Sequence, residues 1–164
     1  MGDVYDTTIK QIKAQGGEKS RLGMSARMWI SHAERLPRVD ELCDALAVQL
    51  GSTDFDVGNI PSMLTLVNCC QGLITIDKEA STMRLIHTLQ EYLSGHPDIF
   101  SKPHSEMAEI CLTYLNSKYV KALLTACSSD TQITSFLKYC SIRWGVHAKR
   151  EPLDYGCNRY RLPV

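Results

Sequence analysis

The stretch LITIDKEASTMRLIHTLQEYL, residues 73–93, decides the fold because it joins two strand patterns directly to a helix pattern. Residues 73–76 and 82–86 are β-branched or alternating runs, and the polar segment DKEAS between them is typical of a hairpin loop. Thr88 and Glu91 then have the spacing of a capping box. The stretch therefore predicts a β-hairpin followed at once by a helix with Thr88 as its N-cap.

Helical patterns surround this stretch on both sides. Upstream, apolar periodicity predicts four helices, which are residues 3–15, a helix capped by Ser20 and interrupted at Pro37, a helix from Val39 that Gly51 ends, and a helix with Pro61 in its first turn. Downstream, it predicts helices over residues 104–117 and 136–149. Residues 151–164 have no apolar face, so we expect an irregular tail there.

The order helix, helix, hairpin, helix is typical of a winged-helix unit. We therefore expect a mainly α fold of the α+β class, a helical bundle with a winged-helix unit that contains one short β-hairpin. A winged helix that reads DNA needs basic residues on its recognition helix and on its wing. Residues 61–72 have none, and DKEAS has one lysine against two acids, so a nucleic-acid partner is disfavoured.

The composition of the 164-residue chain is that of a folded globular protein, with 44% hydrophobic and 22% charged residues. Its 18 lysines and arginines equal its 18 aspartates and glutamates, so no net charge would draw it to nucleic acid or to an anionic membrane. The first ten residues, MGDVYDTTIK, lack the apolar core of a secretion signal, and no segment approaches the length of a membrane span. We expect a soluble cytoplasmic protein.

Seven cysteines form an odd set without a CxxC pair, and several fall on apolar helical faces. This pattern favours buried thiols in a reducing compartment. Zinc sites usually show two close pairs of ligands, and only the adjacent Cys69 and Cys70 come near that pattern. Because adjacent side chains on a helix diverge, we expect no metal site.

No segment has the pattern of a catalytic motif. GGEKS, residues 16–20, lacks the frame of a phosphate-binding loop, and Ser25 lies in a helical pattern without the second glycine of a nucleophile elbow. Asp40, Glu41 and Asp44 fit a solvated helix face better than a pair of catalytic carboxylates. We expect no catalytic residues and no enzyme activity.

His87, at the joint of strand and helix, has two interpretations. It can cap the strand end or pack beside Tyr92, as a histidine at such a joint often does. Alternatively, its imidazole can donate a hydrogen bond to an anionic oxygen that the N-terminus of the following helix attracts.

Six segments resemble the region after the nucleotide-binding core in fungal NACHT-type signal-transduction NTPases of the STAND class. That region carries a GPI inositol-deacylase-like winged-helix domain and is commonly followed by ankyrin repeats. The resemblance covers residues 3–150, nearly the whole chain, and is carried by MWISHAER, VDELCDALAVQLGS, LVNCCQGLITIDKEAS, RLIHTLQEYL, MAEICLTYLNS and YCSIRWGVHAKRE.

The resemblance implies a fragment with a helical spacer (residues 1–36), a winged-helix domain (37–100), a following helical region (101–150) and an irregular tail (151–164). The sequence contains neither a Walker motif nor the 33-residue period of ankyrin repeats. ATP, ADP or GTP would therefore be bound only by an NTPase core outside this sequence, and the chain itself would hold no cofactor. Its partner would be that NACHT nucleotide-binding domain or another protein.

In the wider family, a histidine at this joint contacts the bound nucleotide and holds the resting state. LIHTLQEYL resembles the joint, which implies nucleotide contact for His87, although fungal relatives usually place a phenylalanine between the histidine and the threonine. The resulting hypothesis is a noncatalytic regulatory region that acts by domain packing and conformational switching. A stand-alone protein-interaction adaptor and a truncated remnant without selected activity are the alternatives.

Overall fold

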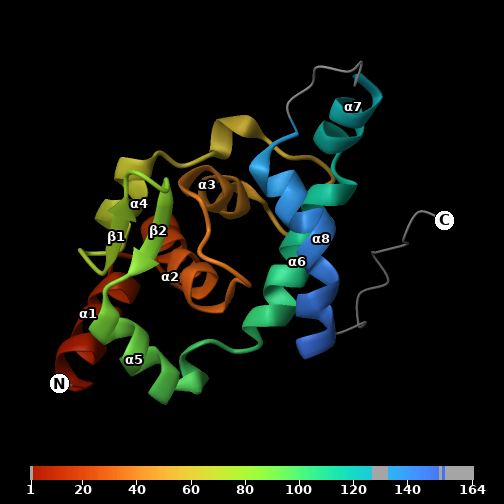
Figure 1. Ribbon diagram of the computed structural model, residues 1–164. Helices are drawn as coiled ribbons and strands as arrows, with labels where there is room; N and C mark the ends of the chain where they lie inside the picture. The colour runs from red at the N-terminus through yellow and green to blue at the C-terminus, as the bar shows by residue number, and fades with distance from the viewer. Residues whose placement is uncertain (1, 127–132, 152, 154–164) are drawn as a thin grey trace. The chain divides into compact units, whose positions relative to one another are not determined.

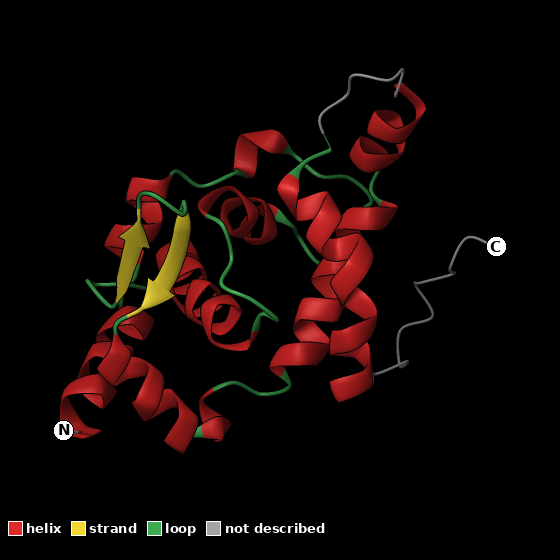
Figure 2. Ribbon diagram, viewed as in Figure 1, coloured by secondary structure: helices red, strands yellow, loops and turns green. Residues whose placement is uncertain are grey.

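A computed structural model describes residues 2–126, 133–151 and 153 of the chain. Within these residues the fold is mainly helical, with eight α-helices and one pair of strands (Figures 1 and 2). The expected mainly α fold with one short β-hairpin is confirmed. Most of the expected tail lies outside the described residues.

The chain divides into two compact units. One is made of residues 1–47 and 58–101, and the other of residues 48–57 and 102–164. The domain boundaries expected from the sequence stay predictions.

The first unit contains the hairpin, and α2 is its central helix. This helix packs against α1, α3, α4 and β2. The elements of the unit are α1 (Gly2–Ala14), α2 (Gly17–His32), α3 (Val39–Ala47), α4 (Met63–Cys69), β1 (Ile74–Asp77), β2 (Thr82–Leu85), α5 (His87–Gly95) and the 3-10 helix η2 (Pro97–Ile99).

The hairpin forms where the sequence predicted it. β1 and β2 pair antiparallel, with Ile74 opposite Leu85. Asp77 holds the turn, because its Oδ1 accepts hydrogen bonds from the backbone amides of Glu79 and Ala80, both at 3.1 Å. Both strands lie within one residue of the expected ranges, and DKEAS supplies the turn.

The segment between α2 and α3 pairs with β2 over a single residue, like a very short third strand. Arg38 forms an isolated antiparallel bridge with Thr82, and the amide of Val39 donates to the carbonyl of Ser81 at 2.9 Å. Periodicity could not predict this pairing, because it is only one residue long. A short outer strand next to a two-stranded wing is the arrangement of a winged helix.

Helices α1, α2 and α4 approach one another closely at Gly23 of α2. A Cβ atom at this position would lie 2.6 Å from the carbonyl oxygen of Cys69 and 2.8 Å from Cγ2 of Ile12. Only a residue without a side chain fits here without a shift of the backbone. The approach helps to close the core of the unit, whose fully buried apolar residues include Ile12, Leu42, Leu66, Met83 and Leu89.

The second unit is built on α6 and α8, which lie side by side (Figure 1). Tyr114 of α6 contacts Phe55 edge-on and Phe136 of α8 at a tilt, with ring centroids 4.9 and 4.8 Å apart. Thr134 caps α8 by accepting a hydrogen bond from the amide of Leu137 at 3.2 Å. The helices of this unit are α6 (Pro103–Asn116), α7 (Lys118–Ala126) and α8 (Ser135–Arg150).

Two helix starts differ from the expected ones. α2 begins at Gly17 after an N-cap at Gly16, so the expectation that Ser20 caps this helix is wrong. Gly16 has a left-handed φ of 70°, which glycine adopts readily and which lies outside the α-helical region. The helix therefore starts directly after Gly16 and not after Ser20. α4 is capped by Ser62, whose hydroxyl accepts from the amide of Thr65 at 3.1 Å, so the expected proline lies before the helix.

α3 ends earlier than expected, and a helix that the sequence did not predict, α7, follows α6. α3 ends at Ala47, well before Gly51, although its apolar stripe continues into Val48, which is buried in irregular backbone. Apolar spacing alone therefore overestimated the length of this helix. α7 was not predicted, and only one residue, Ser117, separates it from α6. The Ser117 hydroxyl accepts a hydrogen bond from the amide of Val120 at 3.2 Å, in the first turn of α7.

Candidate functional site

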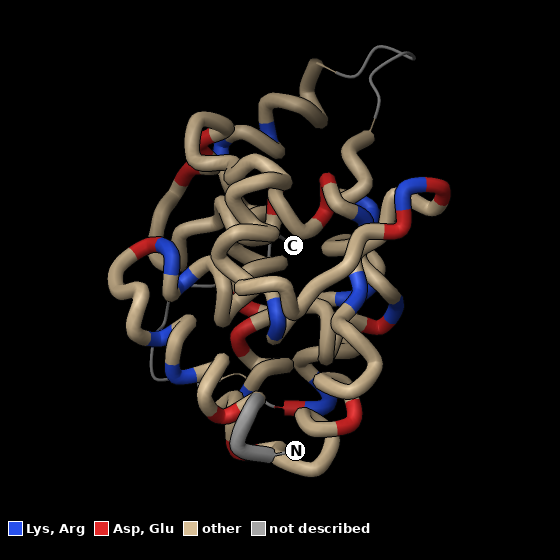
Figure 3. The backbone as a smooth tube through the Cα atoms, turned by 90° about the vertical axis from the view of Figure 1, so that its left-hand side faces the viewer, with Lys and Arg blue, Asp and Glu red and all other residues tan. Residues whose placement is uncertain are grey.

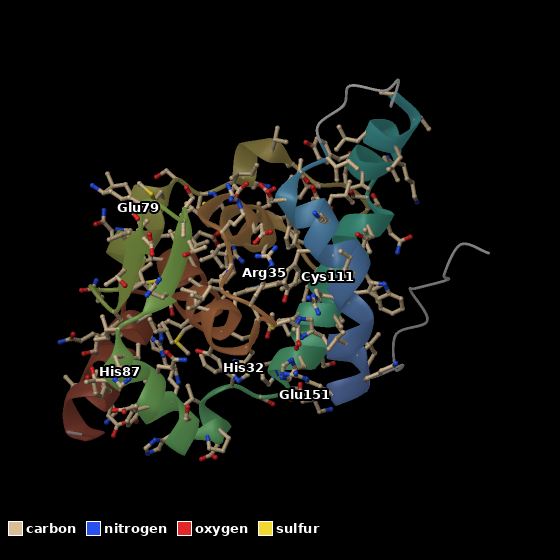
Figure 4. The ribbon with its side chains drawn as sticks, in the orientation of Figure 1. His32, Arg35, Glu79, His87, Cys111 and Glu151 are labelled. Atoms are coloured by element: carbon tan, nitrogen blue, oxygen red, sulfur yellow. The ribbon has the colours of Figure 1, made fainter. Side chains whose placement is uncertain are left out.

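His87 is the first residue of α5 and lies at the joint between the hairpin and that helix (Figure 4). Its side chain is 83% exposed, and its Nδ1 lies 3.7 Å from Oε1 of Glu91, one turn along the helix. It is not buried beside Tyr92, whose ring stacks on His96 with centroids 4.2 Å apart. The imidazole is therefore open to solvent, and its contact with a nucleotide stays a prediction.

Thr88 does not cap α5, so the expected capping box is wrong. The helix begins two residues earlier, with Ile86 at the N-cap position and no side chain accepting a hydrogen bond from the first turn. The hydroxyl of Thr88 instead accepts a hydrogen bond from the phenol of Tyr5 in α1. The first-turn amides therefore lack a side-chain cap beside His87, which leaves a partial positive charge at this end of α5.

Two tyrosines connect α1 to α5 next to this joint. Tyr5 donates to Thr88, and Tyr92 donates its phenolic hydrogen to Oδ1 of Asp6. The hydrogen bond to Asp6 raises the pKa of Tyr92, because losing the phenolic proton would break it. The two tyrosine rings also contact each other, with centroids 5.4 Å apart. These contacts attach the N-terminal helix to the helix that carries His87.

The start of α4 exposes apolar side chains. Leu64 is 68% exposed, Met63 is 48% exposed and Ile60, just before the helix, is 36% exposed. We call these three residues the α4 surface. The helical spacing of Leu64, Val67 and Cys70 suggests one apolar stripe, but only Cys70 of the three is fully buried and Leu64 is exposed. Residues 63–67, MLTLV, are almost wholly apolar, so a helix there has to expose some of them.

Charge near the α4 surface is sparse. α4 contains no lysine or arginine, and the turn of the hairpin carries Lys78 between Asp77 and Glu79. In Figure 3, acidic and basic residues are interspersed along the backbone. A winged helix that binds DNA concentrates positive charge on these two elements.

Arg27 of α2 is a buried cation. It is fully buried, and among the described residues its Nε and Nη2 have no hydrogen-bond partner, while Nη1 lies 3.6 Å from Sδ of Met24. Burial lowers the pKa of Arg27, because desolvation disfavours the charged form. The sequence offered no sign of this group, since arginine usually lies at the surface.

Of the three acidic residues of α3, only Asp40 lies on the solvated face that the sequence predicted, with its side chain 54% exposed. Glu41 is only 3% exposed and is paired with Arg35. Burial, together with the neighbouring carboxylates of Asp40 and Glu41, raises the pKa of the Asp44 carboxyl to about 6. These carboxylates are structural groups of the first unit.

The five described cysteines are free and buried, which confirms the expected buried thiols at these positions. Burial raises the pKa of Cys43 to about 11 and that of Cys70 to about 12. Cys127 and Cys157 lie outside the described residues. No group of three or more His, Cys, Asp or Glu side chains in the described part of the chain is placed to hold a metal ion.

Comparison with known families gives one match. The family model described as GPI inositol-deacylase, winged helix domain, matches residues 10–108, which include the hairpin, the α4 surface and His87. No curated protein and no solved structure matches the sequence. None of the described helices is both long enough and apolar enough to cross a membrane.

Proposed function

The chain belongs to the family of the GPI inositol-deacylase winged helix domain, and from this membership we propose that it is a noncatalytic regulatory region that packs on a NACHT-type nucleotide-binding core. The core would be a separate domain or chain and would hold the ATP, ADP or GTP. This chain would favour one conformational state of that core. We place the complex in the cytoplasm.

The observation that supports a protein partner is the α4 surface. A winged helix that reads DNA places this helix in the major groove and covers it with basic residues. Here the same helix has no basic residue and exposes Met63 and Leu64. Removing apolar surface from water contributes about 25 cal/mol per Å², so a complementary apolar patch on the core would bind this surface.

His87 is the residue that would make packing depend on the nucleotide. It lies at an N-terminus whose amides lack a side-chain cap, and its ring is 83% exposed. A phosphate group is attracted by such a terminus and can accept a hydrogen bond from an imidazole. Contact in only one nucleotide state would shift the equilibrium between packed and released arrangements.

The test is capture of the full chain by a separately expressed NACHT core loaded with ADP or with a non-hydrolysable ATP analogue. We expect capture in one nucleotide state, loss of that dependence in His87→Ala, and roughly tenfold weaker binding in Leu64→Ser. Leu124→Ser is the matched control, because Leu124 is 58% exposed on α7, in the other unit.

Each of the other outcomes has a defined meaning. Capture that ignores the nucleotide and is weakened by Leu64→Ser would replace the switch with a protein-interaction adaptor that uses the same surface. Absence of capture in both nucleotide states would favour a remnant without selected activity and would overturn the proposal.

A further inference from the structure

The second unit contains a cavity of about 380 Å³ at the junction of α6 and α7. Its walls are loop residues 51–53, Thr113 and Asn116 near the end of α6, and Lys118 and Lys121 at the start of α7. This volume lies within the range of pockets that hold small organic molecules. All of the described lining residues belong to the second unit.

The charged groups among the described lining residues of this cavity are both positive. Lys118 and Lys121 lie nearly one turn apart on α7, both are exposed, and none of the described residues that line the cavity is an aspartate or a glutamate. Neither ammonium group forms an ion pair within the described part of the chain. The remaining polar groups of the described wall are hydroxyls and one amide, and the Ser52 hydroxyl and the Asn116 amide already donate to backbone carbonyls. The two ammonium groups are therefore the main donors for an anion, and none of the described lining residues supplies a competing carboxylate.

Asp54, the acidic residue that directly follows loop residues 51–53, already accepts hydrogen bonds from the backbone. Oδ1 of Asp54 accepts hydrogen bonds from the amides of Phe55 at 2.9 Å and Tyr119 at 3.2 Å. The carbonyl of Thr53 accepts from the amide of Lys118 at 3.3 Å. These bonds attach the loop to α7, so the two walls of the cavity hold their spacing. They also occupy the first amides of α7, which leaves anion binding to the lysine side chains.

The surface between the polar groups is aliphatic. The lining residues that can supply it are the two lysines, through their stems, and Thr53 and Thr113, through their methyl groups. We propose that the cavity binds a small organic anion, with a carboxylate or phosphate group on Lys118 and Lys121 and an apolar body against the aliphatic wall. This site is independent of the proposed packing on an NTPase core, because it uses neither His87 nor the α4 surface.

The test is calorimetric titration of the full chain with benzoate, phenyl phosphate and the neutral probe benzyl alcohol. We expect saturable binding of at least one anion at ligand concentrations up to about 1 mM, weaker binding as salt is added, and none of the neutral probe. Comparing benzoate with phenyl phosphate tells which anionic group the lysines prefer.

The double variant Lys118→Gln/Lys121→Gln should bind that anion roughly tenfold or more weakly, because it loses two charge-assisted contacts. The charge-matched control is Lys138→Gln/Lys149→Gln, with both lysines exposed on α8, and it should bind as the wild type does. Equal binding by the two double variants, equal binding of the neutral probe, or no binding of either anion to the wild type would overturn the proposal. The neutral probe keeps the test decisive if the first variant does not fold.

Discussion

The carboxylate of Glu41 in α3 is held in a two-pronged ion pair by the guanidinium group of Arg35. The Nη2–Oε1 distance is 2.5 Å and the Nη1–Oε2 distance is 2.8 Å. Oε2 also accepts a hydrogen bond from the backbone amide of Arg38 at 2.9 Å, next to the bridge from Arg38 to Thr82. One buried carboxylate thus fixes both the first turn of α3 and the chain that approaches the hairpin.

Replacing Glu41 with glutamine should lower the free energy of unfolding by about 1–3 kcal/mol, because the buried site loses charge-assisted hydrogen bonds. Chemical denaturation measures this change. Glu79→Gln is the matched control, since Glu79 is exposed in the hairpin turn, and it should change stability by less than about 0.5 kcal/mol. Equal effects of the two substitutions would mean that the pair with Arg35 does not stabilise the fold.

Two glycines in helices should respond to alanine in opposite directions. Gly23→Ala places a methyl group against the backbone of Cys69 and should destabilise the protein by about 1–3 kcal/mol, despite its higher helix propensity. Gly145→Ala in α8 meets no atom within 4 Å and should stabilise by up to about 1 kcal/mol. Melting temperatures of both variants check this pair, and a stable Gly23→Ala protein would refute the close approach of α1, α2 and α4.

The substitution Arg27→Met should raise the stability of the protein by about 1–4 kcal/mol. A buried guanidinium group that lacks hydrogen bonds costs desolvation free energy, and methionine fills a similar volume without that cost. Denaturant unfolding at neutral pH measures the change. A loss of stability instead would show that Arg27 is bound to a group that the described residues do not supply.

Asp44 should make stability depend on pH between about 4 and 6. Its pKa is about 6 in the folded protein and 3.8 in a free aspartate, so the folded state binds this proton more tightly than the unfolded chain does. The stabilisation is complete below about pH 4 and is lost as the pH rises through 6.

The substitution Asp44→Asn should therefore raise the melting temperature at pH 7 and change it much less at about pH 3, below both pKa values, where the carboxyl is mostly protonated in both states. Asp98→Asn, which replaces an exposed carboxyl in η2, should show no such change between the two pH values. A gain for Asp44→Asn that is the same at both pH values would argue against a buried, desolvated carboxyl.

Local patterns were sufficient to predict the hairpin and most of the helices. The turn at Asp77 and the strand alternation act within a few residues, so residues 73–86 carry their own signal. The interactions that the sequence did not predict join distant segments. Thr88 is bonded to Tyr5, 83 residues away, which no capping rule can anticipate.

A contact between two histidines of the second unit, the buried His147 and the partly buried His104, is another such case. Nδ1 of His104 lies 2.8 Å from Nδ1 of His147, and Nε2 of His147 lies 2.9 Å from the hydroxyl of Tyr139. His104 and His147 are 43 positions apart and fit no motif, so their contact follows only from the packing of α6 on α8. The cavity beside Lys118 was missed for the same reason, because its wall combines residues 51–53 with helices that start 50 or more residues later.

The central claim is that the α4 surface and His87 bind a nucleotide-loaded NACHT core. Its most direct test is the dissociation constant of the full chain for that core, measured by calorimetry with ADP and with a non-hydrolysable ATP analogue. We predict a difference of roughly tenfold or more between the two nucleotides, which disappears in His87→Ala. Equal dissociation constants for the two nucleotides in the wild type would contradict the account.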